Sequence, residues 1–139
     1  MNLIIDAGNT SVKLAIFKKT EIIHLESVAA YDFVAAVKII FKNYAKIQFA
    51  IISSVGALSK EQMNVLAIFC EVHELSNTSK VPFKNSYASP QTLGVDRLAL
   101  ATAAFYFNPH HNNLIIDAGT CITYDMLNDF DEYLGGSIS

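Results

Sequence analysis

One short stretch of sequence occurs twice in this chain, and it constrains the fold more than any other feature. Residues 3–8 read Leu-Ile-Ile-Asp-Ala-Gly, and residues 114–119 repeat these six letters at an offset of 111 residues. An uncharged run of branched apolar residues is typical of a strand buried on both faces, and the Gly after it favours the turn of a β-hairpin. The offset is too long for a solenoid or propeller repeat. We therefore expect two domains of similar construction, each opening with the same hairpin.

Each copy places groups suited to phosphate binding where its strand ends. Asp6 and Asp117 close the two runs, a Gly that admits a ligand to the backbone follows, and small hydroxyl residues come next. We align residues 9–14 with 120–125 and expect a second strand in each copy, over 12–17 and 122–127. A buried Asp must be hydrogen-bonded, paired or close to a metal, because an unpaired buried charge is prohibitive. One Asp-Ala-Gly turn alone is more often an ordinary hairpin, but two identical copies favour a duplicated phosphate site.

The composition indicates a packed globular protein. Of the 139 residues, 52% are hydrophobic and 17% charged, and ten basic against thirteen acidic residues give a net charge of −3. With no run of Lys or Arg, a nucleic-acid groove has little support. No apolar stretch reaches the roughly 20 residues that span a bilayer, so we expect no membrane partner. The isolated Cys70 and Cys121 fit a reducing cytoplasm.

The order of the expected elements predicts an α/β fold with a mixed sheet flanked by helices. A third strand is expected over 21–28, followed by a helix over 31–44, a strand over 46–55, a helix from Ser59 and an edge strand over 72–75. Residues 76–89 look like a connector. Ser89 and Pro90 then have the residue types of a helix N-cap and first position, and that helix is expected to run to Phe107. Residues 130–139 would form the third strand of the second copy.

The predicted domains are 1–89, a first domain with its connector, and 90–139, the start of a second. After Asp117 too few residues remain to repeat the helices and strands of the first copy. We therefore expect this chain to be part of a longer protein, with the start of a duplicated second domain.

Four motifs in order resemble those of type III pantothenate kinases, within the superfamily of actin, hexokinase and Hsp70. The first phosphate motif corresponds to Asp6–Lys13, and the Gly-x-Asp-Arg motif to Gly94–Arg97 with Tyr87 before it. The second phosphate motif corresponds to Asp117–Thr123, and the Gly-Gly-x-Ile motif to Gly135–Ile138. The resemblance implies a ribonuclease H-like or actin-like ATPase fold in which ATP is held between two hairpins.

The resemblance also implies a reaction: phosphorylation of pantothenate by ATP to 4′-phosphopantothenate, the first step of coenzyme A synthesis, by a cytoplasmic homodimer. It implies Mg²⁺ with the ATP and a monovalent cation, K⁺ or NH₄⁺. The residues it implies are Asp96 as the catalytic proton acceptor; Asp6, Ala7, Gly8, Asn9, Thr10, Ser11, Val12, Lys13 and Thr120 as ATP contacts; Tyr87, Gly94, Val95, Asp96 and Arg97 as pantothenate contacts; and Asp117 as the ligand of the monovalent cation.

The residue chemistry agrees with these roles and leaves alternatives. Asp6 is suited to orient hydrated Mg²⁺, a role that Asp117 could share as its duplicate. Lys13 could offset phosphate charge or be an ordinary solvated strand residue. Asp96 could accept the proton of a primary alcohol, and Arg97 could hold a carboxylate with two hydrogen bonds. A Gly inside the predicted helix costs about 1 kcal/mol relative to Ala, so something should require Gly94.

Two other functions use the same hairpins. A non-catalytic nucleotide-binding accessory or regulatory protein would keep both hairpins without needing Asp96. A sugar or acetate kinase of the superfamily would keep them with a different acceptor motif.

Overall fold

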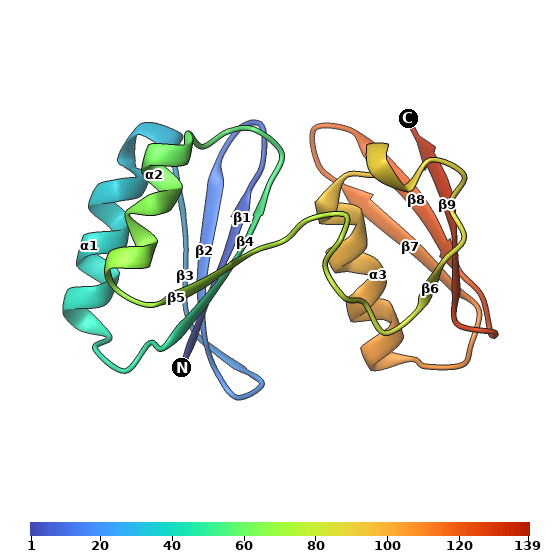
Figure 1. The fold of residues 1–139 in the computed structure, drawn as a ribbon, viewed down its shortest axis with the longest axis horizontal. Coiled ribbons are helices and arrows are strands. Elements are labelled where there is room, and N and C mark those ends of the chain that lie inside the picture. The colour runs from blue at the N-terminus through green and yellow to red at the C-terminus, as the bar shows by residue number, and fades with distance from the viewer. The chain divides into compact units, whose positions relative to one another are not determined.

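The structure is a computed structural model that describes residues 1–139, and the chain folds into two compact units (Figure 1). Unit 1 comprises Met1–Leu75 and unit 2 comprises Ser76–Ser139. No helix in either unit has the length and apolar character needed to cross a membrane.

Unit 1 is built on a five-stranded mixed sheet with the order β3-β2-β1-β4-β5. Strands β1 (Asn2–Ala7), β2 (Val12–Lys18) and β3 (Glu21–Val28) form an antiparallel meander. Strands β4 (Phe49–Ser54) and β5 (Glu71–Glu74) add to it in parallel. The meander, the parallel strands and the edge position of β5 confirm what the sequence pattern predicted.

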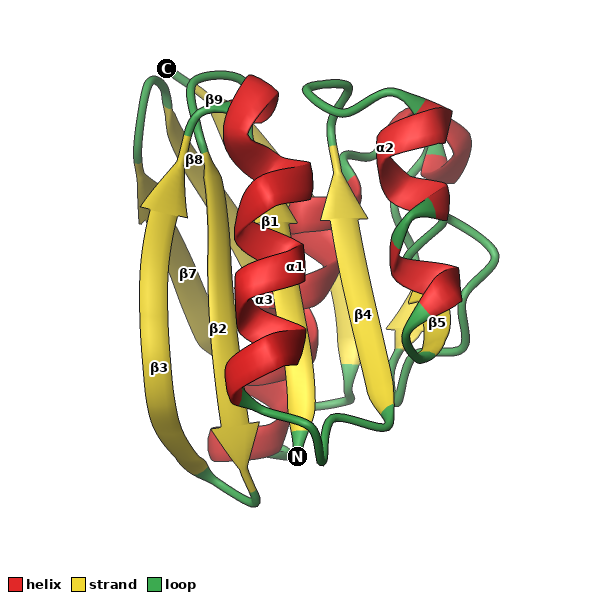
Figure 2. Cartoon of the chain, turned by 90° about the vertical axis from the view of Figure 1, so that its left-hand side faces the viewer, coloured by secondary structure: helices red, strands yellow, loops and turns green.

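Helix α1 (Phe33–Asn43), entered through a 3₁₀ turn over Ala30–Asp32, covers one face of this sheet (Figure 2). It buries Phe33, Ala36, Val37 and Ile40, which fall on one side of a helix because they recur every three or four residues. The sheet meets them with alternate residues of β1 and β2, each at most 1% exposed: Leu3, Ile5, Ala7, Val12, Leu14 and Ile16. Full burial of such side chains contributes about 1.5–3 kcal/mol each, so this layer is the main core of unit 1.

The helix expected from Ser59 forms, and its regular α-helical part is short. Ser59 does cap α2 (Lys60–Asn64), since its hydroxyl accepts the Gln62 amide while the Gln62 side chain accepts the Ser59 amide. The chain then tightens into a 3₁₀ turn, η2 (Leu66–Ile68), which buries Leu66 but leaves Ala67 exposed. Ala67 is exposed because the tighter turn changes which residues face the sheet.

Unit 2 contains a four-stranded mixed sheet with the order β6-β9-β8-β7. Strands β7 (Asn113–Ala118), β8 (Ile122–Leu127) and β9 (Glu132–Ile138) form the second antiparallel meander. The two-residue strand β6 (Lys84–Asn85) pairs in parallel with β9. Residues 76–89, expected as a connector attached to the first domain, thus lie in unit 2 and contribute a strand to its sheet.

Helix α3 (Val95–Phe107) begins later than the sequence suggested. Pro90–Thr92 form a 3₁₀ turn, η3, and the Ser89 side chain makes no capping hydrogen bond. Leu93 is extended and Gly94 is the N-cap of α3. The prediction of one helix from residue 90 was therefore wrong. Ser89 and Pro90 precede only a single 3₁₀ turn, and the extended Leu93 separates that turn from α3.

The repeated strand is covered differently in the two units. In β7, Leu114 and Ile116 are 63% and 58% exposed, whereas α3 packs on the opposite face of the sheet, near Ile115. The expectation that both copies are buried on both faces was therefore wrong in this structure, because each sheet has a helical layer on one side.

Candidate active site

The first hairpin turn presents its polar residues at the tip between β1 and β2. The Gly8 amide donates to the Ser11 carbonyl over 3.1 Å, which leaves Asn9 and Thr10 exposed at the tip. Asp6 lies opposite Lys13 across the two strands, with 3.6 Å between carboxylate oxygen and Nζ, and both side chains are at least half exposed. These groups are therefore accessible to a charged ligand, and water screens their mutual attraction.

Two of the residues that the resemblance places at ATP cannot reach it with their side chains. Ala7 is 1% exposed and Val12 is fully buried, both in the core beneath α1. The Ala7 carbonyl already accepts the amide of Val55. Any contact of Ala7 or Val12 with a nucleotide would have to use the remaining backbone atoms.

The second hairpin has the same strands but a turn that is one residue shorter. Ala7 pairs with Val12 across a four-residue turn, whereas Ala118 pairs with Ile122 across three residues. The Gly119 amide closes this turn on the Cys121 carbonyl at 3.0 Å. The alignment of residues 120–125 with 9–14 was therefore wrong beyond the turn: the counterpart of Lys13 is Thr123, so the second hairpin lacks the lysine.

The oxygen groups at both strand ends suit a hard cation. Asp6 and Asp117 were expected to be buried, but Asp6 is half-buried and Asp117 is exposed, since both strands end at the surface. In the pairing register each faces a buried hydroxyl without a hydrogen-bond partner, Ser53 beside Asp6 and Thr123 beside Asp117. No cluster of three or more His, Cys, Asp or Glu accompanies them. A cation that keeps most of its water or shares phosphate oxygens fits such a sparse oxygen set.

Asp96 lies in the first turn of α3, where the helix dipole favours a carboxylate. Its Oδ1 accepts the Arg97 amide at 2.9 Å. A Cβ on Gly94 would lie 2.5 Å from that same oxygen. Gly94 precedes the helix instead of lying inside it, and a Cβ there would displace the Asp96 carboxylate from this position.

Arg97 is turned into the interior of unit 2 and bonded to Asp125. Its Nε donates to both carboxylate oxygens at 3.1 and 3.0 Å, and its Nη2 donates to Oδ1 at 2.5 Å. The Tyr133 hydroxyl donates to the same Oδ1. Asp125 and Tyr133 are 1% and 0% exposed, so this is a buried network. The hydrogen bonds that Arg97 donates to Asp125 raise the pKa of the guanidinium, and burial beside Asp125 raises the pKa of the Tyr133 phenol.

Tyr87 joins this network from the segment before α3. Its ring lies edge-on to Tyr133, with 6.3 Å between centroids, and against Gly135 so closely that a Cβ there would clash with it. Gly135 also has φ +92°, a conformation that other residues rarely adopt. The neighbouring Gly136 has no room for a Cβ because the Tyr124 carbonyl occupies the space. The Gly-Gly pair is therefore required by Tyr87 on one side and by strand β8 on the other.

Two of the four sequence motifs thus meet inside unit 2: Gly94–Arg97 with Tyr87 before it, and the Gly135–Gly136 pair. Asp125 and Tyr133 connect them and were not among the predicted site residues. A signal for Asp125 was present, since a carboxylate in the apolar alternation of residues 122–127 needs a partner if it is buried. Tyr133 carried no such signal.

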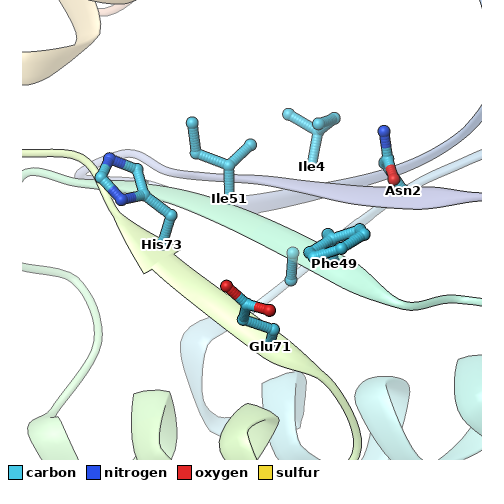
Figure 3. A pocket seen from close by; sticks show the side chains of 7 residues that line it. Asn2, Ile4, Phe49, Ile51, Glu71 and His73 are labelled. Carbon is cyan, nitrogen blue, oxygen red and sulfur yellow. The ribbon is translucent and has the colours of Figure 1, made fainter. Parts of the chain in front are cut away.

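A separate shallow groove of about 170 Å³ lies on the face of the unit 1 sheet that the helices leave open (Figure 3). It is lined by side chains from β1, β4 and β5, among them Ile4, Phe49, Ile51 and His73. None of the predicted site residues borders it, so it is not the site that the motifs describe.

Comparison with known proteins gives one consistent family. The model of the type III pantothenate kinase family matches residues 2–139. Type III pantothenate kinases of Christiangramia forsetii and Flavobacterium psychrophilum are 42% and 41% identical over 139 residues, which is 100% of this chain but 57% and 58% of those proteins. The chain therefore spans little more than half the length of the curated relatives it matches.

One solved structure supports the fold. A putative N-acetylglucosamine kinase from Porphyromonas gingivalis superposes with a TM-score of 0.52 at 11% identity, over 99% of this chain and 47% of that one. At this identity the likeness concerns the fold alone. Together with the two mixed sheets, it confirms the predicted actin-like ATPase class.

Proposed function

The chain belongs to the type III pantothenate kinase family, and on that premise we propose that the whole protein transfers the γ-phosphoryl group of ATP to the primary alcohol of pantothenate. The products are 4′-phosphopantothenate and ADP. The observation that carries the proposal is the meeting of Tyr87, Gly94–Arg97 and Gly135–Gly136 around the start of α3. We assign the acceptor site to this place because function on a shared fold depends on the residues of the site.

Asp96 is the proposed proton acceptor. Its carboxylate is half-buried and held by the Arg97 amide, with a second oxygen left to receive the proton of the attacking alcohol. Positioned bases of this kind contribute about 10²–10⁴ in rate. A non-catalytic accessory protein would not need the space that Gly94 keeps for this carboxylate, which favours an enzyme over that alternative.

The two hairpins are the proposed nucleotide site. Gly8 closes the first turn, Asn9 and Thr10 in that turn and Thr120 in the second offer backbone N–H and hydroxyl groups, and Lys13 offers positive charge. Phosphoryl transfer asks a protein mainly for such positioning and charge compensation. Asp6 would hold Mg²⁺, which neutralises charge on the phosphates when bound. Asp117 would hold the monovalent cation, K⁺ or NH₄⁺; activity unchanged when both are replaced by tetramethylammonium would contradict this.

We further propose that the whole protein works in the cytoplasm as a homodimer. Two free cysteines, Cys70 half-buried and Cys121 exposed, suit a reducing compartment. The dimer rests on the family resemblance, and light scattering that finds a monomer at micromolar concentration would contradict it.

The test uses the protein at the full length of its relatives, in a coupled assay of ADP release with pantothenate. We expect Asp96→Asn to lower kcat by about 10²–10⁴. Gly94→Ala should lower kcat by at least tenfold with little change in melting temperature, because the clash falls on a mobile carboxylate rather than on backbone. Asp32→Asn, which changes an aspartate before α1 in unit 1, is the matched control. Turnover with a sugar but not with pantothenate would contradict the proposal.

A further inference from the structure

We propose that Asp125 is a positioning residue for the pantothenate site, and that it acts by clamping Arg97 with the help of Tyr133. The inference rests on the proposed function, and it adds to that function two residues that the motifs do not contain. It follows from the geometry of the buried network, from its charge balance and from its absence in the duplicate hairpin.

The clamp determines which edge of Arg97 a substrate can meet. Both carboxylate oxygens of Asp125 accept from the Nε and Nη2 side of the guanidinium, and Nη1 takes no part in this contact. The edge that would grip a carboxylate through Nε and Nη2 is therefore already occupied. Arg97 can meet an acidic substrate only from the Nη1 side.

Charge keeps the clamp closed. The negative charge of the buried Asp125 carboxylate is balanced by Arg97, and Tyr133 donates one further hydrogen bond to it. Removal of one partner of a buried pair strands the other charge in a medium of low polarity, which is strongly unfavourable. A substrate carboxylate would therefore not draw Arg97 away from Asp125, and Arg97 stays a fixed part of the site.

One carboxylate thereby fixes both proposed sides of the acceptor site. Arg97 is the residue next to Asp96 and donates its amide to the Asp96 carboxylate, so a fixed Arg97 fixes the first turn of α3. Tyr133, which donates its hydroxyl to Asp125 Oδ1, packs edge-on against Tyr87. Asp125 is the group that Arg97 and Tyr133 share.

The duplicate hairpin shows that the strand pairing alone does not need this carboxylate. Ile115 pairs with Asp125 in unit 2, and its counterpart Ile4 pairs with Ala15 in unit 1. The position of Asp125 in the first copy is thus Ala15, which lies with Ile4 on the side of the sheet that α1 leaves open. The carboxylate therefore belongs to the helix-covered interior of unit 2, where Arg97 meets it, and not to the hairpin pairing itself.

The test is a double-mutant cycle in the protein at the full length of its relatives, assayed well below the melting temperature. We expect Asp125→Asn and Arg97→Lys each to raise the KM for pantothenate at least tenfold and to leave the KM for ATP within twofold. Because both changes break one clamp, the double variant D125N/R97K should be no worse than the more affected single variant. Tyr133→Phe removes one hydrogen bond to Asp125 but keeps the ion pair, so it should raise the KM for pantothenate only about threefold. This variant tests the clamp even if Asp125→Asn folds poorly.

Glu132→Gln is the matched control, because it breaks the exposed ion pair between Glu132 and Lys84 on the same sheet. It should change neither KM. A lower melting temperature with unchanged pantothenate KM in Asp125→Asn and Tyr133→Phe would make the network merely structural and overturn the inference. Additive effects in the cycle would also overturn it. A wild-type protein that does not phosphorylate pantothenate would instead refute the proposed function, and the inference with it.

Discussion

Strands β1 and β7 have the same six residues, Asn-Leu-Ile-Ile-Asp-Ala, and yet they bury opposite faces. In β1 the Leu3 and Ile5 side is closed by α1, and Ile4 lies on the open side. In β7 the equivalent Leu114 and Ile116 are exposed, and Ile115, the counterpart of Ile4, packs with α3. Identical sequence therefore leads to opposite burial within one chain.

The difference arises outside the strands. Both sides of the repeated run are apolar, so either side can accept a helix, and the choice depends on which helix the unit provides. In unit 1 the helix follows the meander, whereas in unit 2 it precedes the meander. The lesson is that a two-sided apolar strand specifies burial but not which face is buried.

The largest expected effect tests this contrast directly. Leu3→Ala should lower the free energy of unfolding of unit 1 by about 2–5 kcal/mol, because it opens a cavity in a closed core. Leu114→Ala should change that of unit 2 by no more than about 0.5 kcal/mol, because the side chain is already in water. Hydrogen exchange read on peptides of each unit would measure both.

Equal costs at the two positions would break the comparison, since they would mean that the Leu114 face is covered. The same two substitutions in a protein of the relatives' full length would sharpen it. If Leu114→Ala lowers the unfolding free energy only in the full-length protein, the additional residues of that protein cover Leu114.

A smaller effect is expected at high pH and concerns unit 2. The pKa of Tyr133 is raised in the folded state, so the folded protein holds the phenolic proton more tightly than the unfolded chain. This stability is fully present below the unfolded pKa of about 10 and is lost as the pH rises from there toward the folded pKa. The unfolding free energy should fall by about 1.4 kcal/mol per pH unit in that window. Urea unfolding of wild type and Tyr133→Phe between pH 8 and 11 would check it.

Unit 1 has no counterpart of the Tyr133–Asp125 hydrogen bond. The difference in unfolding free energy between wild type and Tyr133→Phe should therefore change only above about pH 10, and the change should come from unit 2. Parallel curves for wild type and Tyr133→Phe would show that the phenol titrates alike in the folded and unfolded states.

The smallest expected effect separates two serines that share a helix-start signature. Ser59→Ala should cost about 1 kcal/mol, because the capping box of α2 depends on its hydroxyl. Ser89→Ala should cost no more than a few tenths, because this side chain makes no capping hydrogen bond. Thermal unfolding of the two variants side by side is the measurement, and a larger loss at Ser89 would mean that η3 is capped after all.

Much of the architecture was predictable from local sequence. The two meanders follow from apolar runs that end at Gly, and α1 follows from the spacing of Phe33, Val37 and Ile40. The misplaced start of α3 shows the limit of such patterns. Ser89 and Pro90 have the residue types of a helix start, but the extended Leu93 separates their turn from the helix, and no local signal marks this.

The sequence by itself determined the duplication, the mixed α/β class and the family, because these depend on residue order and spacing along the chain. Tertiary structure alone decided which face each repeated strand buries, the one-residue difference between the hairpin turns, and the engagement of Arg97 by Asp125. Those features depend on groups that are 28 or more residues apart or on different elements. Their partners are fixed by packing, and a pattern read along the chain contains no information on which buried charge will meet which.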